Sequence, residues 1–110
     1  MENIVDPAFA EAVNRLWLKF LPQLEQRVAT LEAAAANLAN GSLAPSGQEK
    51  ASSEAHKLAG VLGTFGLSEG TVLAREAEVA YKCDVKADPA AAVRLAAIAA
   101  QLRSMLANRL

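Results

Sequence analysis

The sequence predicts an all-α fold, an antiparallel four-helix bundle, from three observations. Apolar residues recur at helical spacing along four segments of the chain. Residues that favour helices, chiefly alanine, leucine, glutamate, lysine and arginine, dominate the composition. Prolines, glycines and capping residues divide the segments and leave only short connections between them. Amphipathic helices with short connections pack most simply as an antiparallel bundle.

The first predicted helix begins with Asp6 as its N-cap and Pro7 at its first position. An apolar stripe follows, and Asn40-Gly41 ends the helix by left-handed capping. Pro22 interrupts the stripe, so we expect the helix to be kinked or split there. The residues of the stripe are Phe9, Val13, Leu16, Trp17, Phe20, Leu24, Val28, Leu31 and Leu38.

The second and third helices follow a loop over residues 42–47. Ser46-x-x-Glu49 is a capping box that predicts the start of the second helix, which runs to about Gly63. After a turn, Ser68 is expected to cap a third helix that ends near Cys83, itself a small buried residue. The expected core positions of these helices are Ala51, Ala55, Leu58, Leu62, Val72, Leu73, Ala77 and Ala80.

The last helix is predicted from a second aspartate–proline pair. Asp88-Pro89 repeats the signal that opens the first helix, and apolar spacing continues nearly to Leu110. The expected core positions are Val93, Ala97, Ile98, Leu102, Met105 and Leu106.

Composition narrows the class of protein. A chain of 110 residues fits one domain, residues 1–110. A net charge of −1 without a basic stripe argues against nucleic-acid or membrane-surface binding. One cysteine, no zinc-ligand cluster, no signal peptide and no long apolar run predict a cytoplasmic protein that binds neither a metal nor a cofactor. We expect a monomer.

The chemistry is expected around His56, the only histidine in the chain. At about 100° per residue, Gly60 and Gly63 lie within about 40° of it, while Leu58 and Leu62 lie on the opposite side. A glycine inside a helix costs about 1 kcal/mol relative to alanine, so these two suggest close approach of another molecule. Three small residues extend this surface, namely Ser52, Ser53 and Ala59.

The same residues are also compatible with purely structural roles. The glycines could serve tight packing between helices, or end the helix near Gly66. A single histidine on a helix is often only a surface or core residue. Trp17 and Phe20 could bind a partner, although packing in the core or over one end of a bundle is more common for such residues.

The spacing His56-x-Leu58-x-Gly60, with glycines at offsets seven and ten, resembles the histidine phosphotransfer (HPt) domain of bacterial phosphorelays. Gly63-Thr64-Phe65-Gly66 is similar in particular to the phosphoacceptor domain of the chemotaxis histidine kinase. The resemblance extends over nearly the whole chain in length and helical character. The chain departs from the family at Ala59, where a lysine is usual.

The resemblance implies a phosphocarrier without kinase activity. His56 would accept a phosphoryl group from a histidine kinase or a receiver-domain aspartate and pass it to another receiver-domain aspartate. The expected partners are response-regulator receiver domains, a hybrid histidine kinase, or both. Mg²⁺ would be bound by the partner receiver domain. No nucleotide-binding motif is needed or found.

Two charged residues are candidates to support His56. In the chemotaxis kinase domain a glutamate 22 residues after the histidine bonds its ring, and this offset leads to Glu78. Lys57 could supply positive charge near the phosphoryl group in place of the usual lysine. Either side chain could instead be an ordinary solvated charge. Further cationic candidates, which the sequence does not rank, are Lys50, Arg75 and Lys82.

Two functions besides phosphotransfer are compatible with these patterns. The first is a non-catalytic helical adaptor that binds a partner protein through the Gly60 and Gly63 face, or through Trp17 and Phe20. The second is a helix bundle that binds DNA or a membrane, against which the near-neutral charge argues.

Overall fold

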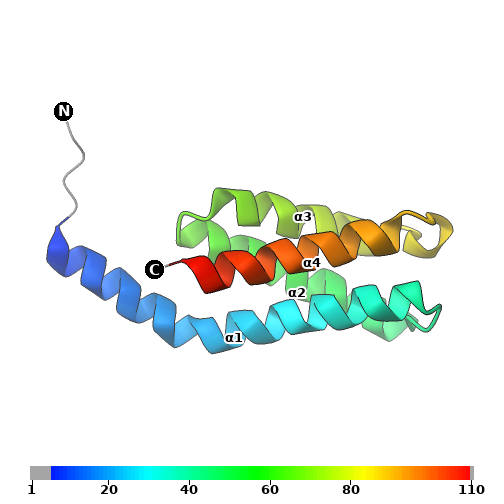
Figure 1. The fold of residues 1–110 in the computed structure, drawn as a ribbon, viewed down its shortest axis with the longest axis horizontal. Coiled ribbons are helices and arrows are strands. Elements are labelled where there is room, and N and C mark those ends of the chain that lie inside the picture. Colours follow the sequence, from blue (N-terminus) through cyan, green and yellow to red (C-terminus); the bar gives the residue numbers. More distant parts are fainter. Residues whose placement is uncertain (1–5, 110) are drawn as a thin grey trace.

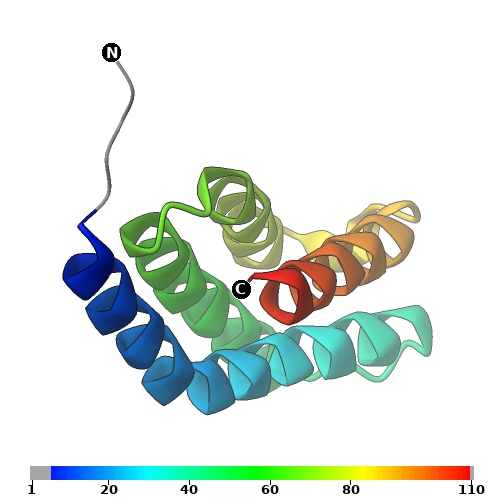
Figure 2. The same cartoon turned by 60° about the vertical axis from the view of Figure 1, so that its left-hand side comes forward.

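The computed structural model describes residues 6–109. Their elements are α1 (Pro7–Ala39), α2 (Pro45–Thr64), α3 (Ser68–Lys82), the 3-10 helix η1 (Val85–Ala87) and α4 (Ala91–Asn108). Successive α-helices run in opposite directions, and the most extensive packing joins α2 to α3 and α1 to α4 (Figures 1 and 2). The predicted antiparallel four-helix bundle is confirmed.

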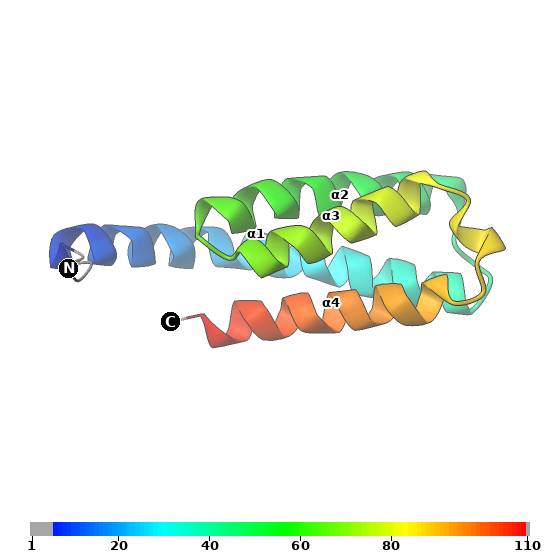
Figure 3. The ribbon, with the colours of Figure 1, turned by 90° about the horizontal axis from the view of Figure 1, so that it is seen from above.

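The first helix, α1, is continuous and kinked. At its start Asp6 Oδ1 accepts a hydrogen bond from Ala8 N at 3.0 Å, as an N-cap should. Pro22 lies inside the helix. Because proline has no N–H and its ring crowds the preceding turn, it bends a helix. Figure 1 shows the change of direction in the light-blue part of α1, and Figure 3 shows the first half of the helix extending beyond the bundle.

Glycines end α1 and α2 with the same local structure. Gly41 has a φ of +71° and Gly66 a φ of +77°, values that L side chains rarely adopt. After Gly66, the amide of Leu67 donates to the carbonyl of Leu62 at 2.9 Å, which closes a Schellman motif. The predicted cap at Gly41 is confirmed, and Gly66 fixes the sharp turn from α2 into α3.

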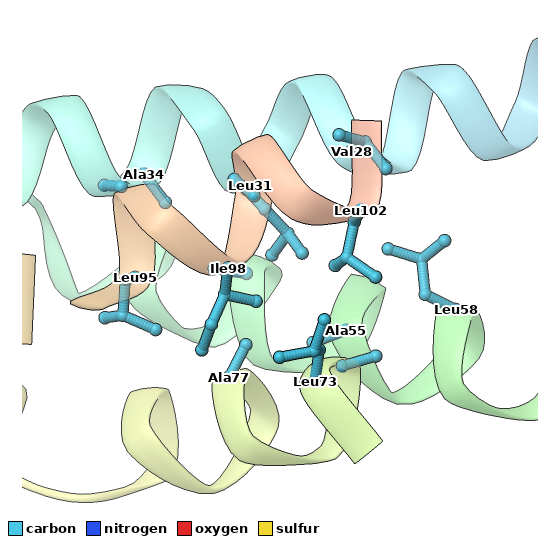
Figure 4. Close-up of a cluster of buried hydrophobic side chains, with 14 of the residues drawn as sticks. Val28, Leu31, Ala34, Ala55, Leu58, Leu73, Ala77, Leu95, Ile98 and Leu102 are labelled. Carbon is cyan, nitrogen blue, oxygen red and sulfur yellow. The ribbon is translucent and has the colours of Figure 1, made fainter. Parts of the chain in front are cut away.

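The core lies along the axis between the four helices. Figure 4 shows apolar side chains from all four converging there. The largest fully buried side chains are Leu24, Leu31, Leu58, Leu62, Ile98, Leu102 and Val28. Leu58 and Leu62 therefore face the core, as predicted. This burial leaves the opposite face of α2 available to solvent.

Trp17 closes one end of the bundle. Its ring packs edge-on against Phe65, with centroids 5.1 Å apart, and Phe20 meets Phe65 at 6.2 Å. The guanidinium carbon of Arg109 lies 4.7 Å from the centroid of Trp17, a cation–π distance. Trp17 itself is only 3% exposed. Trp17 is therefore packed as part of a lid over the end of the bundle, while Phe20 and Phe65 are partly exposed.

The predicted starts of α2 and α3 are wrong. Helix α2 begins at Pro45, so Ser46 lies inside its first turn and makes no capping box. Proline is well suited to the first helical position because its fixed φ is already helical and its missing N–H is not needed there. Helix α3 begins at Ser68 with Leu67 as its N-cap. The Schellman turn leads straight into that helix, and no side chain makes a capping hydrogen bond at its start.

The last helix also starts later than predicted. Asp88 Oδ1 accepts a hydrogen bond from Ala90 N at 2.9 Å, the same local bond that Asp6 makes. Here it closes a turn over Pro89 and Ala90, and α4 begins at Ala91. The predicted cap is therefore wrong: Asp88 does not cap α4, whose N-cap is Ala90 without a side-chain hydrogen bond, and the predicted start is two residues early.

Several predicted core positions are exposed. In an alanine-rich helix more than one face is apolar, so spacing does not fix the buried face. The buried face of α3 carries Gly70, Leu73, Ala74, Ala77 and Tyr81. The apolar residues that the sequence assigned to the stripe or core and the structure exposes are Phe9, Leu16, Val72, Cys83, Val93 and Ala97. Phe9 and Leu16 lie on the part of α1 before Pro22.

Within residues 6–109, the helices are too short or too polar for any of them to span a membrane.

Candidate functional site

His56 projects from the solvent face of α2. Its neighbours Ala55 and Leu58 are buried in the core, while the His56 side chain is 72% exposed. The ring is nevertheless held on one side, because Nδ1 lies 3.0 Å from Oε2 of Glu78 on α3. The structure thus brings together the two residues that the 22-residue offset paired. The imidazole is both oriented and accessible.

Glu78 binds two groups through one oxygen. Oε2 lies 3.0 Å from His56 Nδ1 and 2.9 Å from Lys82 Nζ. Lys82 follows Glu78 by four residues on α3, which is the spacing at which side chains meet on a helix. Of the three cationic candidates that the sequence did not rank, Lys82 is therefore the one that the structure brings to Glu78.

The charge of Glu78 fixes the hydrogen on the histidine ring. The hydrogen bond from Lys82 is the largest cause of the lowered pKa of Glu78; burial opposes it, and the bond with His56 adds to it. Glu78 is therefore a carboxylate near neutral pH, and a carboxylate can only accept hydrogen bonds. Nδ1 must then carry the hydrogen, so the neutral ring has its lone pair on Nε2.

Titration of Glu78 should reflect this pairing. Because its pKa in the folded protein is lowered from the ordinary 4.5, the pairing stabilises the fold above that pH and is lost as the pH falls through the lowered value. A carboxyl-carbon NMR titration should give a midpoint below 4.5, and Lys82→Ala should move it upward. Lys57→Ala is the matched control and should not move it. A midpoint that ignores Lys82→Ala would contradict the assignment.

A groove of about 610 Å³ runs between α2 and α3 and ends at this histidine. Its lining residues are Pro45, Gln48, Glu49, Ser52, Ser53, His56, Glu78, Tyr81 and Lys82. Lys82 supplies the one ammonium group of this lining, beside the carboxylates of Glu49 and Glu78. Tyr81 forms part of the floor, and burial raises the pKa of its hydroxyl to about 12, so it stays neutral there.

Polar side chains join α2 to α3 along the groove. Gln48 Nε2 donates to the carbonyls of Tyr81 at 2.8 Å and Cys83 at 3.0 Å at the end of α3, and the Cys83 carbonyl also accepts from the amide of Val85 at 2.8 Å. Ser52 Oγ donates to the carbonyl of Glu78 at 3.3 Å. The backbone that carries Glu78 is therefore held at a fixed distance from the helix that carries His56.

The surface of small residues is only partly exposed. Ser53, Gly60 and Gly63 lie on the outside of α2. Ser52 and Ala59 are buried against α3, which corrects their expected place on the exposed surface. Both lie where α2 and α3 approach closely, and small side chains permit that approach. The exposed surface beside His56 is thus narrower than the sequence suggested.

The two glycines near His56 differ in their surroundings. A Cβ added at Gly60 would meet nothing within 4 Å, so internal packing does not require glycine there. A Cβ added at Gly63 would lie 3.2 Å from Thr71 Oγ1 on α3. That hydroxyl donates to the carbonyl of Ala59 at 2.8 Å and is not free to move without cost. Gly63 therefore lies in a packed contact between α2 and α3, whereas the space around Gly60 is open.

Lys57 lies away from the groove. Its Nζ is 3.4 Å from Glu54 Oε2, and the same oxygen accepts from Arg27 Nη1 at 2.9 Å. These three side chains join α2 to α1, on the other side of α2 from Glu78. In this arrangement the charge of Lys57 is directed toward Glu54.

Sequence reasoning overlooked Gln48 and did not rank Lys82. The i,i+4 spacing of Glu78 and Lys82 was the signal that could have ranked the lysine. Gln48 offered no such signal, because its role depends on how α3 ends against α2.

Within residues 6–109 no three His, Cys, Asp or Glu side chains gather as metal ligands. No curated protein and no solved structure matches the chain. A family model described as Hpt domain matches residues 15–109, which include His56, Glu78 and the groove. The chain belongs to the Hpt domain family and is a phosphotransfer module of two-component signalling.

Proposed function

We propose that His56 is the phosphoacceptor of this module and that Nε2 is the atom that is phosphorylated. The observation that carries the proposal is the Nδ1 to Glu78 contact of 3.0 Å on a side chain that is 72% exposed. A phosphocarrier needs a nucleophilic nitrogen that is oriented yet open to a partner's active site. These two properties coincide at His56.

The transfer step can be written with charges balanced. The Nε2 lone pair attacks the phosphorus of a receiver-domain aspartyl phosphate, the N–P bond forms, and the P–O bond to the aspartate breaks. The aspartate leaves as a carboxylate. Nδ1 keeps its hydrogen, so the ring gains a positive charge, which the carboxylate of Glu78 stabilises at 3.0 Å. No proton need be transferred, and the reverse step returns the phosphoryl group to an aspartate.

The partner supplies the rest of the catalytic machinery. In this proposal the acidic residues and Mg²⁺ of a receiver domain stabilise the charge on the phosphoryl group. The donor is a hybrid histidine kinase or a phosphorylated receiver, and the acceptor is a second receiver. These are cytoplasmic partners, so the relay is assigned to the bacterial cytoplasm. The site then needs no nucleotide motif and no kinase activity of its own.

The adaptor alternative has less support. Trp17 is packed under Arg109 and against Phe65, so it offers little surface to a partner. The open space at Gly60 fits either function. A plain adaptor, however, gives no reason for an oriented histidine beside that space.

Gly60 offers a test of access. Gly60→Ala should raise the free energy of unfolding by about 0.5–1 kcal/mol, because alanine favours the helix and its Cβ meets nothing. Gly60→Gln should fold as well yet slow phosphotransfer, because its side chain would occupy the space that the partner needs. Gly63→Ala is the comparison variant. Its free energy of unfolding should rise less than that of Gly60→Ala, because the added Cβ would crowd Thr71 Oγ1. Wild-type transfer by Gly60→Gln would contradict a role for Gly60 in access.

The function itself is tested by incubating the protein with phosphorylated receiver domains and Mg²⁺. We expect the wild-type chain to take up an acid-labile label, and His56→Gln to take up none while keeping its helical circular dichroism. A wild-type protein that remains unlabelled with every receiver of its own genome would overturn the proposal. If neither the wild type nor His56→Gln is labelled, but both still bind the partner, the adaptor function is favoured.

A further inference from the structure

The groove beside His56 has a charge imbalance that phosphorylation would increase. Its lining includes two carboxylates, Glu49 and Glu78, and the single ammonium of Lys82. A phosphoryl group adds about 1.5 to 2 negative charges near neutral pH. Without a cation to meet it, that charge would be repelled by the carboxylates. The residue that limits this repulsion therefore affects how stable the phosphorylated state is.

Before phosphorylation, Lys82 is paired with Glu78. Lys82 Nζ lies 2.9 Å from Oε2, the oxygen that also meets His56 Nδ1. While the ring is neutral, the ammonium is the positive charge that faces this carboxylate. The Lys82 side chain is 64% exposed and begins on the outer face of α3, so it can turn about its stem without disturbing the core.

Phosphorylation changes which groups need a counter-charge. Once Nε2 carries the phosphoryl group and Nδ1 keeps its hydrogen, the ring is positive and itself balances Glu78. Lys82 is then free to meet the phosphoryl oxygens. We propose that Lys82 is a mobile counter-charge, which pairs with Glu78 while His56 is free and with the phosphoryl group once His56 is phosphorylated. This inference rests on the proposed function of His56.

The comparison with Lys57 makes the inference specific. Lys57 is nearer to His56 in sequence, but its ammonium lies 3.4 Å from Glu54, which also binds Arg27. It does not line the groove. Lys57 and Lys82 are both exposed helical lysines paired with a glutamate, so Lys57→Ala removes a similar charge at a different place.

The experiment measures how the phosphoryl group partitions at equilibrium between the protein and a purified receiver. We expect Lys82→Ala to reduce the ratio of phosphorylated to free His56 by roughly two- to fivefold, the upper part of the range for an exposed ion pair. Lys82→Arg should keep most of the wild-type ratio, and Lys57→Ala should change it less than twofold. Added salt should bring the wild-type ratio toward that of Lys82→Ala, because screening weakens exposed pairs.

Ring ¹⁵N shifts of His56 separate this role from a purely structural one. In Lys82→Ala the hydrogen should remain on Nδ1, because Glu78 still accepts it. Loss of that tautomer would overturn the inference, because Lys82 would then act only by positioning the Glu78 carboxylate. An unchanged ratio in Lys82→Ala would also overturn it. Labelling of the wild-type protein in the same assay tests the proposed function separately. If the wild type is labelled, that function stands, whatever the result for Lys82→Ala.

Discussion

Replacing Glu78 with glutamine is expected to slow phosphoryl acceptance by His56 about 10- to 100-fold, by analogy with the loss seen when the group that orients a metal-binding histidine is changed. Glutamine can still reach Nδ1, but its amide can donate as well as accept. The hydrogen is then no longer confined to Nδ1, and the uncharged amide stabilises the charged phosphorylated ring less well. Single-turnover transfer from a phosphorylated receiver measures the rate.

The control for this change is Glu76→Gln. Glu76 lies on the same helix and pairs with Arg94, with Oε2 2.6 Å from Nε, on a surface away from His56. It should leave the transfer rate unchanged. The ¹⁵N shifts of the single imidazole report the tautomer without overlap from another histidine. If Glu78→Gln kept both the wild-type tautomer and the wild-type rate, Glu78 would not be the orienting group.

Removing the indole of Trp17 should be the most destabilising single change considered. Trp17→Ala deletes a side chain that is 3% exposed and packs on Phe65 beneath Arg109. Large-to-small changes of buried aromatic residues cost about 3–5 kcal/mol. Urea unfolding followed by circular dichroism measures the loss, since the variant lacks the only tryptophan.

Leu18→Ala is the matched control for the lid. Leu18 is adjacent to Trp17 in sequence but 65% exposed, so its loss should change stability by no more than about 0.5 kcal/mol. Equal stability of Trp17→Ala and wild type would mean that the indole does not hold the end of the bundle. A surface role for Trp17, such as partner binding, would then be the one to test.

The fold could be predicted because its signals are local. Asp6 and Pro7 start α1, Pro22 kinks it, and Gly41 ends it, each through backbone chemistry that depends on a few neighbouring residues. The starts of α2 and α3 were less predictable. Both Pro45 and Ser46 are residues that commonly start a helix, and α2 begins at Pro45. The turn at Gly66 leads directly into α3.

The buried faces of α3 and α4 could not be read from spacing alone. Val72 and Val93 are exposed, while less hydrophobic residues of the same helices are buried, namely Gly70, Ala74, Ala91 and Ala99. Close approach between helices selects small side chains. A Cβ at Gly70, for example, would lie 3.0 Å from Leu62 Cδ1. That requirement depends on the packing distance between helices, which hydropathy does not encode.

The candidate site divides in the same way. His56 and its exposure followed from the helical pattern, and Glu78 from a fixed offset that resemblance supplied. Lys82 pairs with Glu78 and Lys57 with Glu54 at local helical spacings, but only folding brings Glu78 to His56 and Glu54 to Arg27. Sequence proximity favoured Lys57, and tertiary packing favours Lys82.

The role proposed for His56 is tested most directly by locating the phosphorus on the protein. After transfer from a phosphorylated receiver, ³¹P–¹⁵N coupling in ¹⁵N-histidine-labelled protein identifies the phosphorylated nitrogen. We expect one phosphoryl group, bonded to Nε2 of His56, with the hydrogen retained on Nδ1 beside Glu78. Phosphorus on Nδ1, on another residue, or on none would contradict that role.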